Sequence, residues 1–216
     1  MARTSKQQPE SPAVQEEEVD GPSRRDRILQ VATEQFAQKG FAAVRIDEIA
    51  KASDCNKQLI YYYFGNKAGL YDAVLSAMIE GTAPAWTAME SLRLEDTAGQ
   101  FLSAGSSANS KFWRRLLVWE GIENSERGDQ EIRMEAERTK AWHREIDIVR
   151  RSQSQGDLRA DMDPAMVALF IVMMSMGPHA LPQITKMLTG EDPGSENFAE
   201  RRRVFAAQLI QALRPE

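Results

Sequence analysis

Apolar residues recur along most of this chain every three or four positions, which is the spacing of an amphipathic helix. The first such stretch follows Ser23 and carries apolar side chains four residues apart as far as Phe36. Ser23 with Asp26 three residues later is typical of a helix N-terminus, and Gly40 suits the left-handed position that follows a helix end. The pattern predicts a helix from about Arg24 to Lys39.

Two shorter helices are expected next. Ile46 to Ala50 has the apolar spacing of a short helix, which residues 53–55 interrupt, and Asn56 is a good N-cap for a third helix from Lys57 to Tyr63. Later helices are expected from Lys67 toward Gly81 and Pro84, Asp96 to Ala108, Lys111 to Glu123, Asp129 to Gln155, Pro164 to Leu188 and Ser195 to Leu213. Pro178 and Pro182 should kink or end the long helix near Gly177. No segment alternates like a strand, so the predicted fold class is all-α.

Composition changes this picture little but excludes several classes of protein. The 216 residues are 42% apolar and 27% charged, as in ordinary globular proteins, whereas residues 1–22 are polar and are expected to form a disordered tail. Cys55 is the single cysteine and there are two histidines, so neither a disulfide framework nor a zinc site of the Cys/His kind is expected. We expect no metal and no cofactor.

The apolar runs also bear on the expected location of the protein. The longest, Met166 to Gly177, has 12 residues, whereas a membrane-spanning helix needs roughly 18 or more. Residues 1–20 lack the apolar segment of a signal peptide. We therefore expect a cytoplasmic protein with no membrane partner.

Charge is distributed unevenly along the chain. The net charge is −5, yet residues 23–67 hold eight basic and five acidic side chains, a local excess of +3, which leaves −8 for the rest. A basic segment on an acidic protein is typical of a chain in which one face meets an anionic partner, although a solvated surface gives the same pattern.

The two short helices, with a tight turn between them and a further helix beside them, predict a helix-turn-helix unit. On its second helix, Ile60 and Phe64 should face the core and leave the polar side chains facing outward. Lysine can donate to guanine or phosphate, glutamine can pair with adenine, and tyrosine hydroxyls can reach phosphates or base edges. Contact with DNA is expected from Arg45, Asn56, Lys57, Gln58, Leu59, Tyr61, Tyr62, Tyr63 and Lys67.

This part of the chain resembles the signature of the TetR family of transcriptional regulators. The matching positions are Phe36, Gly40-Phe41, Ile49-Ala50, Lys57, Ile60-Tyr61-Tyr62-Tyr63-Phe64, Lys67 and Leu70. The resemblance implies a homodimer that binds a palindromic operator and releases it when a small molecule enters a C-terminal helical domain. It therefore divides the chain into a helix-turn-helix domain at 23–68 and an effector-binding and dimerisation domain at 69–216.

Three parts of this stretch depart from the family pattern. The turn reads Ser-Asp-Cys-Asn at residues 53–56 instead of Ala-Gly-Val-Ser, with each replacement chemically close. Arg45 replaces a capping threonine and could contact phosphate, and Leu59 replaces a small polar residue and could touch a thymine methyl group. These differences affect the operator sequence that we expect rather than the activity.

The C-terminal half offers candidates for an effector pocket and a dimer interface. Aromatic, methionine and polar side chains that could line a pocket, or simply fill the core, are Trp86, Trp113, Trp119, Glu120, Trp142, Met173, Met174 and His179. Because residues 166–176 are apolar almost all round, a second subunit is expected to cover them. The interface candidates are Met166, Phe170, Phe198, Phe205, Leu209 and Leu213.

Other functions remain open at this stage. The same fold could act as an activator, could require its ligand in order to bind DNA, or could serve as a helical carrier that does not bind DNA. An enzyme built on Glu120 and Glu123 is a weaker alternative, since these carboxylates are three residues apart and have no evident partner base. The expected function is a ligand-responsive repressor and not an enzyme.

Overall fold

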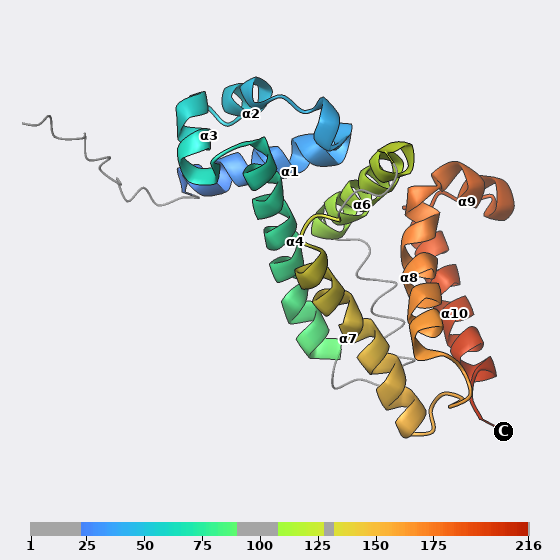
Figure 1. Ribbon diagram of the computed structural model, residues 1–216. Helices are drawn as coiled ribbons and strands as arrows, with labels where there is room; N and C mark the ends of the chain where they lie inside the picture. Colours follow the sequence, from blue (N-terminus) through green and yellow to red (C-terminus); the bar gives the residue numbers. More distant parts are fainter. Residues whose placement is uncertain (1–22, 90–107, 128–131, 216) are drawn as a thin grey trace, which may run out of the picture.

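The computed structural model describes residues 23–89, 108–127 and 132–215, with side chains described at 23–82, 111–125 and 132–215, and the described elements are all helices (Figure 1). In chain order they are α1 (Arg24–Ala43), α2 (Ile46–Ala52), α3 (Lys57–Phe64), α4 (Lys67–Met89), α6 (Ala108–Arg127), α7 (Glu135–Ser154), α8 (Pro164–Ala180), α9 (Pro182–Thr189) and α10 (Glu196–Ala212). The all-α prediction is confirmed.

Local signals in the sequence explain the first helices. The Ser23 hydroxyl accepts the Asp26 N–H at 3.2 Å, and Gly40, at φ 77°, interrupts the helical backbone of α1 where the sequence predicted its end. Asn56 accepts the Leu59 N–H at 2.8 Å and so caps α3. Asp54 takes the left-handed conformation of the turn, with φ 52°, which aspartate tolerates better than most residues.

Later boundaries differ from the predicted ones. Helix α4 continues past Gly81 and Pro84 to Met89, and α7 begins at Glu135 because Met134 adopts a left-handed conformation, with φ 52°. The segment Pro164–Leu188 is bent by 94° into α8 and α9, so the break that Pro178 and Pro182 predicted is present, but it lies at Leu181 and α8 continues through Pro178 to Ala180. The helix predicted at Asp96 to Ala108 lies outside the described residues, apart from Ala108, which begins α6.

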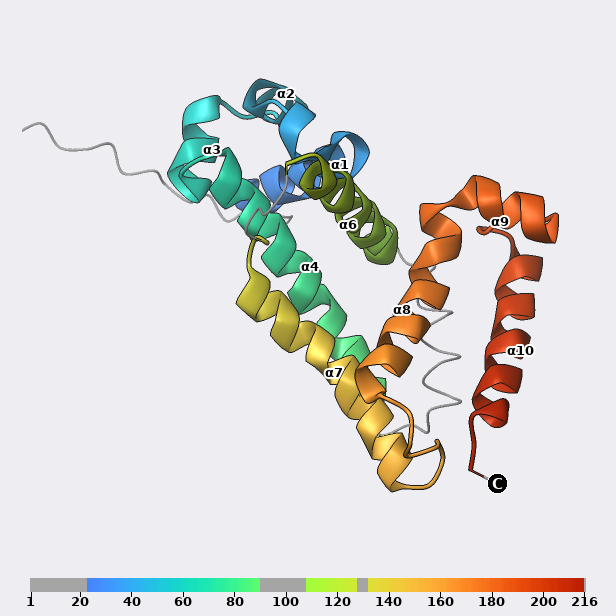
Figure 2. The same ribbon diagram turned by 45° about the vertical axis from the view of Figure 1, so that its right-hand side comes forward.

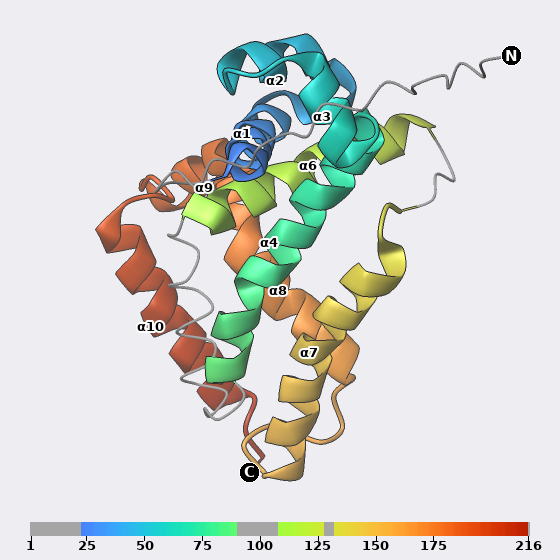
Figure 3. The same cartoon turned by 90° about the vertical axis from the view of Figure 1, so that its left-hand side faces the viewer.

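One apolar cluster joins α1, α2, α3 and the first half of α4, and we call this part of the molecule the head. Its buried members are Ile28, Ala32, Phe36, Ala37, Val44, Ile49, Ala50, Ile60, Phe64, Leu70, Tyr71, Val74, Leu75 and Met78, with Leu116 of α6 added. Helix α4 starts beside α3 and runs on away from it (Figure 3), so it crosses the predicted domain boundary at residue 68.

Helices α6 to α10 form what we call the body. Helix α7 runs beside α4 in Figure 1 and Figure 2. A second cluster joins α7, α8 and α10 through Ile148, Val149, Leu158, Val167, Ala168 and Ile210. Among the described helices, none is both long and apolar enough to cross a membrane alone, and only α8 and α9 taken together pass that test.

Candidate nucleic-acid interface and ligand cavity

Helix α3 has one buried face and one open face. Ile60 and Phe64 lie in the core of the head with 0% and 9% of their surface exposed, as the sequence predicted. The opposite face carries Lys57, Gln58 and two tyrosines, of which Tyr62 is 75% exposed. Helix α3 itself lies on the side of the molecule away from α8–α10 (Figure 1). It therefore presents hydrogen-bonding aromatic side chains to solvent.

The turn between α2 and α3 retains its geometry despite its unusual sequence. The Ser53 hydroxyl donates to the Ile49 carbonyl at 2.7 Å, and Cys55 is half-buried against the core of the head. Asn56 supplies the cap that a serine gives in the family pattern. As the sequence predicted, Arg45 precedes α2 without a side-chain capping bond.

Ion pairs tie α2 to its neighbours. Lys57 at the start of α3 pairs with Asp47 of α2, and Lys39 of α1 pairs with Glu48 of α2. The hydrogen bond from Lys39 and its charge lower the pKa of Glu48. The ammonium of Lys57 thus has a carboxylate partner in the free protein, which sequence reasoning did not find.

The other residues predicted to contact DNA differ in how exposed they are. Arg45, Asn56 and Tyr61 are exposed, whereas Leu59 and Tyr63 are half-buried against the core of the head. Lys67 is also only partly exposed. Its ammonium donates to the Ala42 carbonyl at 3.1 Å and lies 4.8 Å above the ring of Phe41, and burial lowers its pKa. In the free protein, then, Lys67 stabilises the end of α1.

The head is a helix-turn-helix in which one face of α3 is open, and its core packs against α6 of a helical body. This arrangement defines a DNA-binding transcriptional regulator. The sequence matches the family model "Bacterial regulatory proteins, tetR family" over residues 28–74 and the model "Tetracyclin repressor-like, C-terminal domain" over residues 101–210. The chain belongs to the TetR family of transcriptional regulators.

Individual relatives agree with this assignment. The HTH-type transcriptional repressor SCO4008 of Streptomyces coelicolor is 32% identical over 193 residues, which cover 88% of this chain and 97% of that protein. The repressor KstR2 of Mycolicibacterium smegmatis is 24% identical over 69% of this chain and 74% of its own length. The crystal structure of SCO4942, a regulator from S. coelicolor, superposes with a TM-score of 0.66 at 25% identity, covering 89% of this chain and 99% of that one.

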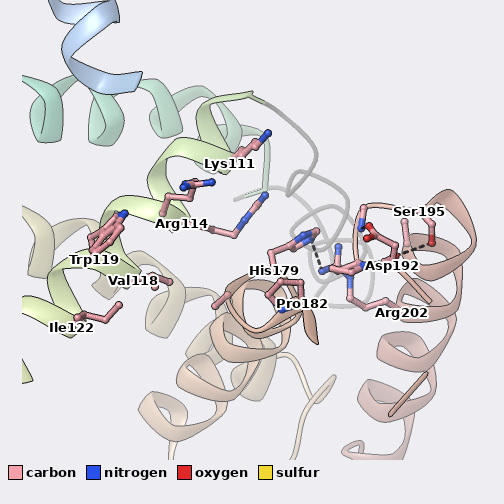
Figure 4. A pocket seen from close by; sticks show the side chains of 15 residues that line it. Lys111, Arg114, Val118, Trp119, Ile122, His179, Pro182, Asp192, Ser195 and Arg202 are labelled. Atoms are coloured by element: carbon pink, nitrogen blue, oxygen red, sulfur yellow. Dashed lines mark hydrogen bonds between the residues drawn. The ribbon is translucent and has the colours of Figure 1, made fainter. Parts of the chain in front are cut away.

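A cavity of about 660 Å³ opens between α6, the α8–α9 corner and α10 (Figure 4). Its lining includes Trp119 and His179, two of the predicted pocket residues. The other predicted residues with described side chains, Trp113, Glu120, Trp142, Met173 and Met174, are not part of this lining, and the side chain of Trp86 lies outside the described residues.

Glu120 and Glu123 have structural partners instead. Both oxygens of Glu120 accept hydrogen bonds of 2.6 Å from the buried guanidinium of Arg138, which also lies 5.8 Å from the ring of Trp113. Glu123 accepts the Ala42 N–H at 3.0 Å. Both carboxylates are therefore engaged in holding helices together. Across the described residues, no three His, Cys, Asp or Glu side chains gather as a metal site would require.

The cavity is basic, and sequence reasoning missed most of the residues that make it so. Lys111, Arg114 and Arg115 come from α6, and Arg202 comes from α10. Burial, together with the nearby Arg114 and Arg202, lowers the pKa of His179 to about 4, so its ring is neutral at neutral pH. The spacing of the three α6 residues could have indicated a basic stripe, but nothing near Arg202 in the sequence indicated that it would join them.

Helix α6 also connects the cavity to the head. Arg115 donates from Nε to the carbonyl of Ala37 in α1 at 2.7 Å. A side chain at Gly40 would meet a Glu123 oxygen at 2.8 Å and the ring of Trp119 at 3.1 Å, so α6 packs directly against this glycine. Two residues of the cavity wall, Arg115 and Trp119, thus touch the end of α1.

The predicted interface residues do not share one environment. Met166 and Phe170 of α8 and Phe205 of α10 are exposed by 62%, 47% and 50%, and Leu209 is partly exposed. Phe198 has a different environment from these. It is 7% exposed and lies inside the chain, where its ring is covered by the guanidinium of Arg202. Leu213 packs on the cluster of α7, α8 and α10.

Proposed function

We propose that this chain is a dimeric repressor, that α3 of each subunit reads one half of a palindromic operator, and that a small molecule bound by the body releases the DNA. The observation that carries this proposal is the division of α3 into a face that is fully packed in the head and a face that is open. A side chain such as Tyr62, exposed by 75%, contributes little to folding and is available to a partner.

The chemistry of the open face suits DNA. Gln58 can form a bidentate pair with adenine, and the hydroxyls of Tyr61 and Tyr62 can donate to phosphates or base edges. Lys57 can exchange Asp47 for a phosphate at small cost, because both members of the pair are more than half exposed and such pairs contribute little to stability.

The remaining predicted contacts lie around this face. Arg45 and Asn56 stand at the N-terminal ends of α2 and α3, where free N–H groups also favour phosphate. We propose that Leu59 touches a thymine methyl group and that Tyr63 and Lys67 reach the DNA backbone with the exposed part of their side chains. Their partial burial makes them secondary contacts.

We further propose that α8 and α10 form the dimer interface. Met166, Phe170 and Phe205 expose apolar surface that a second subunit would bury, and an isologous two-fold interface uses the same patch twice. Two-fold symmetry also matches the requirement that two recognition helices reach major grooves roughly 34 Å apart. Binding, rather than catalysis, is the proposed activity, and its place is the cytoplasm, where the DNA lies.

The proposal is tested by binding of the purified protein to DNA from upstream of its own gene, or to sites selected from random DNA, with excess non-specific competitor. We expect Tyr62→Ala to weaken binding by about 100-fold. Each dimer loses two contacts, and one polar contact is worth roughly 1 to 1.5 kcal/mol. The melting temperature should not change.

Two variants serve as controls. Tyr62→Phe keeps the ring and removes the hydroxyl, so it separates stacking from hydrogen bonding. Met187→Ala truncates a side chain of equal exposure, 76%, on α9 and should leave DNA binding intact. Unchanged affinity of the Tyr62→Ala protein would refute the assignment of α3 as the reading helix.

A further inference from the structure

We propose that the first turn of α1 takes part in DNA binding, and that Arg25 contacts a phosphate of the DNA backbone at the C-terminal end of α3. The inference rests on the proposed function, because it assumes that α3 lies in a major groove. It adds a contact from outside the helix-turn-helix pair, to which α1 otherwise contributes only core side chains such as Ile28 and Phe36.

The first step is the charge of this turn. Arg24, Arg25 and Arg27 are all exposed. Asp26 is the acidic residue of the turn, and its carboxylate accepts a hydrogen bond of 2.8 Å from the Ser23 hydroxyl at the N-cap. Among the residues that the structure describes, no carboxylate forms an ion pair with any of the three arginines. The turn therefore presents a net positive charge to solvent.

The second step is the position of Arg25. Its guanidinium carbon lies 5.3 Å from the centre of the ring of Phe64, the last residue of α3. Because Phe64 is buried in the core of the head, the arginine covers the edge of that core where α3 ends. Figure 1 shows the start of α1 beside this end of α3. A guanidinium that stacks on an aromatic ring keeps its planar set of N–H donors, and that set matches a phosphate.

The third step is the distribution of positive charge along α3. Lys57 occupies the first position of this helix, whereas its last turn carries the tyrosines 61–63 and no cation. Lys67 is the next basic residue in the sequence, and its ammonium donates to the Ala42 carbonyl. Arg25 thus places, beside the C-terminal end of α3, a positive charge that α3 itself lacks there.

The fourth step is the size of the groove. Helix α3 has eight residues and is about 12 Å long, since an α-helix rises roughly 1.5 Å per residue, and the major groove of DNA is also about 12 Å wide. Phosphates line both edges of that groove, so side chains at both ends of such a helix come within reach of a DNA backbone. Lys57 serves one end in this arrangement, and Arg25 serves the other.

The experiment measures affinity for an operator, selected from random DNA, over a range of salt concentrations. Each phosphate contact contributes about −0.9 to the slope of log K against log salt concentration. Arg25→Gln removes two such contacts from a dimer, so the slope should become less steep by about 2, and affinity near physiological salt should fall about tenfold. Arg25→Lys keeps the charge and should keep most of the slope.

Arg27→Gln is the matched control. Arg27 is an exposed arginine of the same turn, and a helix turns by about 100° per residue, so it lies about 200° round α1 from Arg25 and away from Phe64. Its slope should stay close to that of the wild type, and the melting temperatures of both variants report that they are folded. A slope that is unchanged in Arg25→Gln, or changed equally in the two variants, would overturn the proposal.

A second measurement locates the contact on the DNA. In a series of operator duplexes, one phosphate at a time is replaced by a neutral methylphosphonate. At one phosphate in each half-site, we expect the replacement to weaken binding of the wild type and Arg27→Gln about threefold and to leave binding of Arg25→Gln unchanged. If Arg25→Gln is weakened at every position as much as the wild type is, Arg25 contacts no phosphate.

The two proposals fail in different ways. A wild-type protein that binds no selected DNA would overturn the proposed function and this inference with it. A wild-type protein that binds its operator, while Arg25→Gln keeps the same affinity and the same salt dependence, would overturn the inference alone and leave α3 as the reading helix.

Discussion

The head and the body of this protein differ in the kinds of side chain that they bury and expose. In the head, the buried polar residues are Thr33 and Ser53, both neutral, and the large exposed apolar side chains are the tyrosines of α3. The described part of the body buries ionisable side chains, namely Arg138, Glu145 and Arg202, and exposes apolar ones on α8, α9 and α10.

The difference indicates how each part works. A core without buried charge holds α3 in one orientation, which suits recognition of a rigid partner such as DNA. Exposed apolar surface is unfavourable for a single chain, and this cost falls when a second subunit covers it. The core of the head includes one residue of the body, Leu116 of α6, whereas the exposed apolar surface of the body is suited to binding a partner.

The largest expected effect comes from breaking the core of the head. Phe36 is fully buried, and its ring lies 4.9 Å from that of Tyr71 in an edge-on arrangement. Phe36→Ala should lower the free energy of unfolding by about 3 to 5 kcal/mol, through lost burial and the cavity left behind, and should abolish DNA binding. Chemical denaturation measures this. Leu188→Ala, at an 81% exposed position of α9, should change stability by less than about 0.5 kcal/mol.

A charge on the exposed face of the body should break the proposed dimer and leave the fold intact. In Phe170→Glu the new carboxylate would be buried in the interface of both subunits, so we expect dimerisation to weaken by about 100-fold or more. Sedimentation velocity at micromolar concentration reports the change. Ala136→Glu adds the same charge at an exposed position in the first turn of α7 and should leave the dimer unchanged. A Phe170→Glu protein that is still dimeric would place the interface elsewhere.

The buried carboxyl of Glu145 predicts a pH dependence in the body. It is 6% exposed, its Oε1 has no hydrogen-bond partner within the described structure, and burial raises its pKa to about 8, against 4.5 for a free glutamate. Folded protein therefore holds a proton that unfolded protein loses above pH 4.5, so this group lowers stability as pH rises from about 5 to 8, by roughly 1 kcal/mol per pH unit.

Thermal melts of the wild type and Glu145→Gln between pH 5 and 8 check this sign. The glutamine variant should lose less stability over that range, and its advantage should grow with pH. A difference between the two proteins that does not depend on pH would mean that Glu145 is already ionised in the folded state.

The smallest expected effect concerns the N-cap of α3 in the head. Asn56→Ala removes the cap of α3 and should cost about 1 kcal/mol, whereas Asn56→Asp keeps a capping oxygen and should cost little. The aspartate adds a negative charge beside the proposed DNA face, so DNA binding should weaken more in Asn56→Asp than its stability suggests. Equal losses of stability in the two variants would show that the cap is unimportant.

Much of the head could be predicted because its signals are local. The Ser23 cap, the break at Gly40 and the Asn56 cap each act within four residues, and the positions of Ile60 and Phe64 follow from the helical period. The end of α4 and the start of α7 were predicted less well. The same apolar spacing continues across these points, so it does not mark where a helix begins or ends.

In the candidate sites, too, the sequence predicted features that depend on nearby residues and missed those that depend on packing. The sequence indicated that α3 turns Tyr61 and Tyr62 outward, but not that Lys57 pairs with Asp47. In the body it indicated Trp119 and His179, which line the cavity, but not that Phe198 would be buried within the single chain.

The sequence by itself determined the class of fold, the helix-turn-helix and the outward face of α3, since these depend on neighbours within one or two turns of helix. Only the tertiary structure decided that Arg114 and Arg202, from α6 and α10, line one cavity, and that Arg115 joins that cavity to α1. Such contacts depend on how helices far apart in the chain pack, and helical periodicity carries no information about which helix a given face will meet.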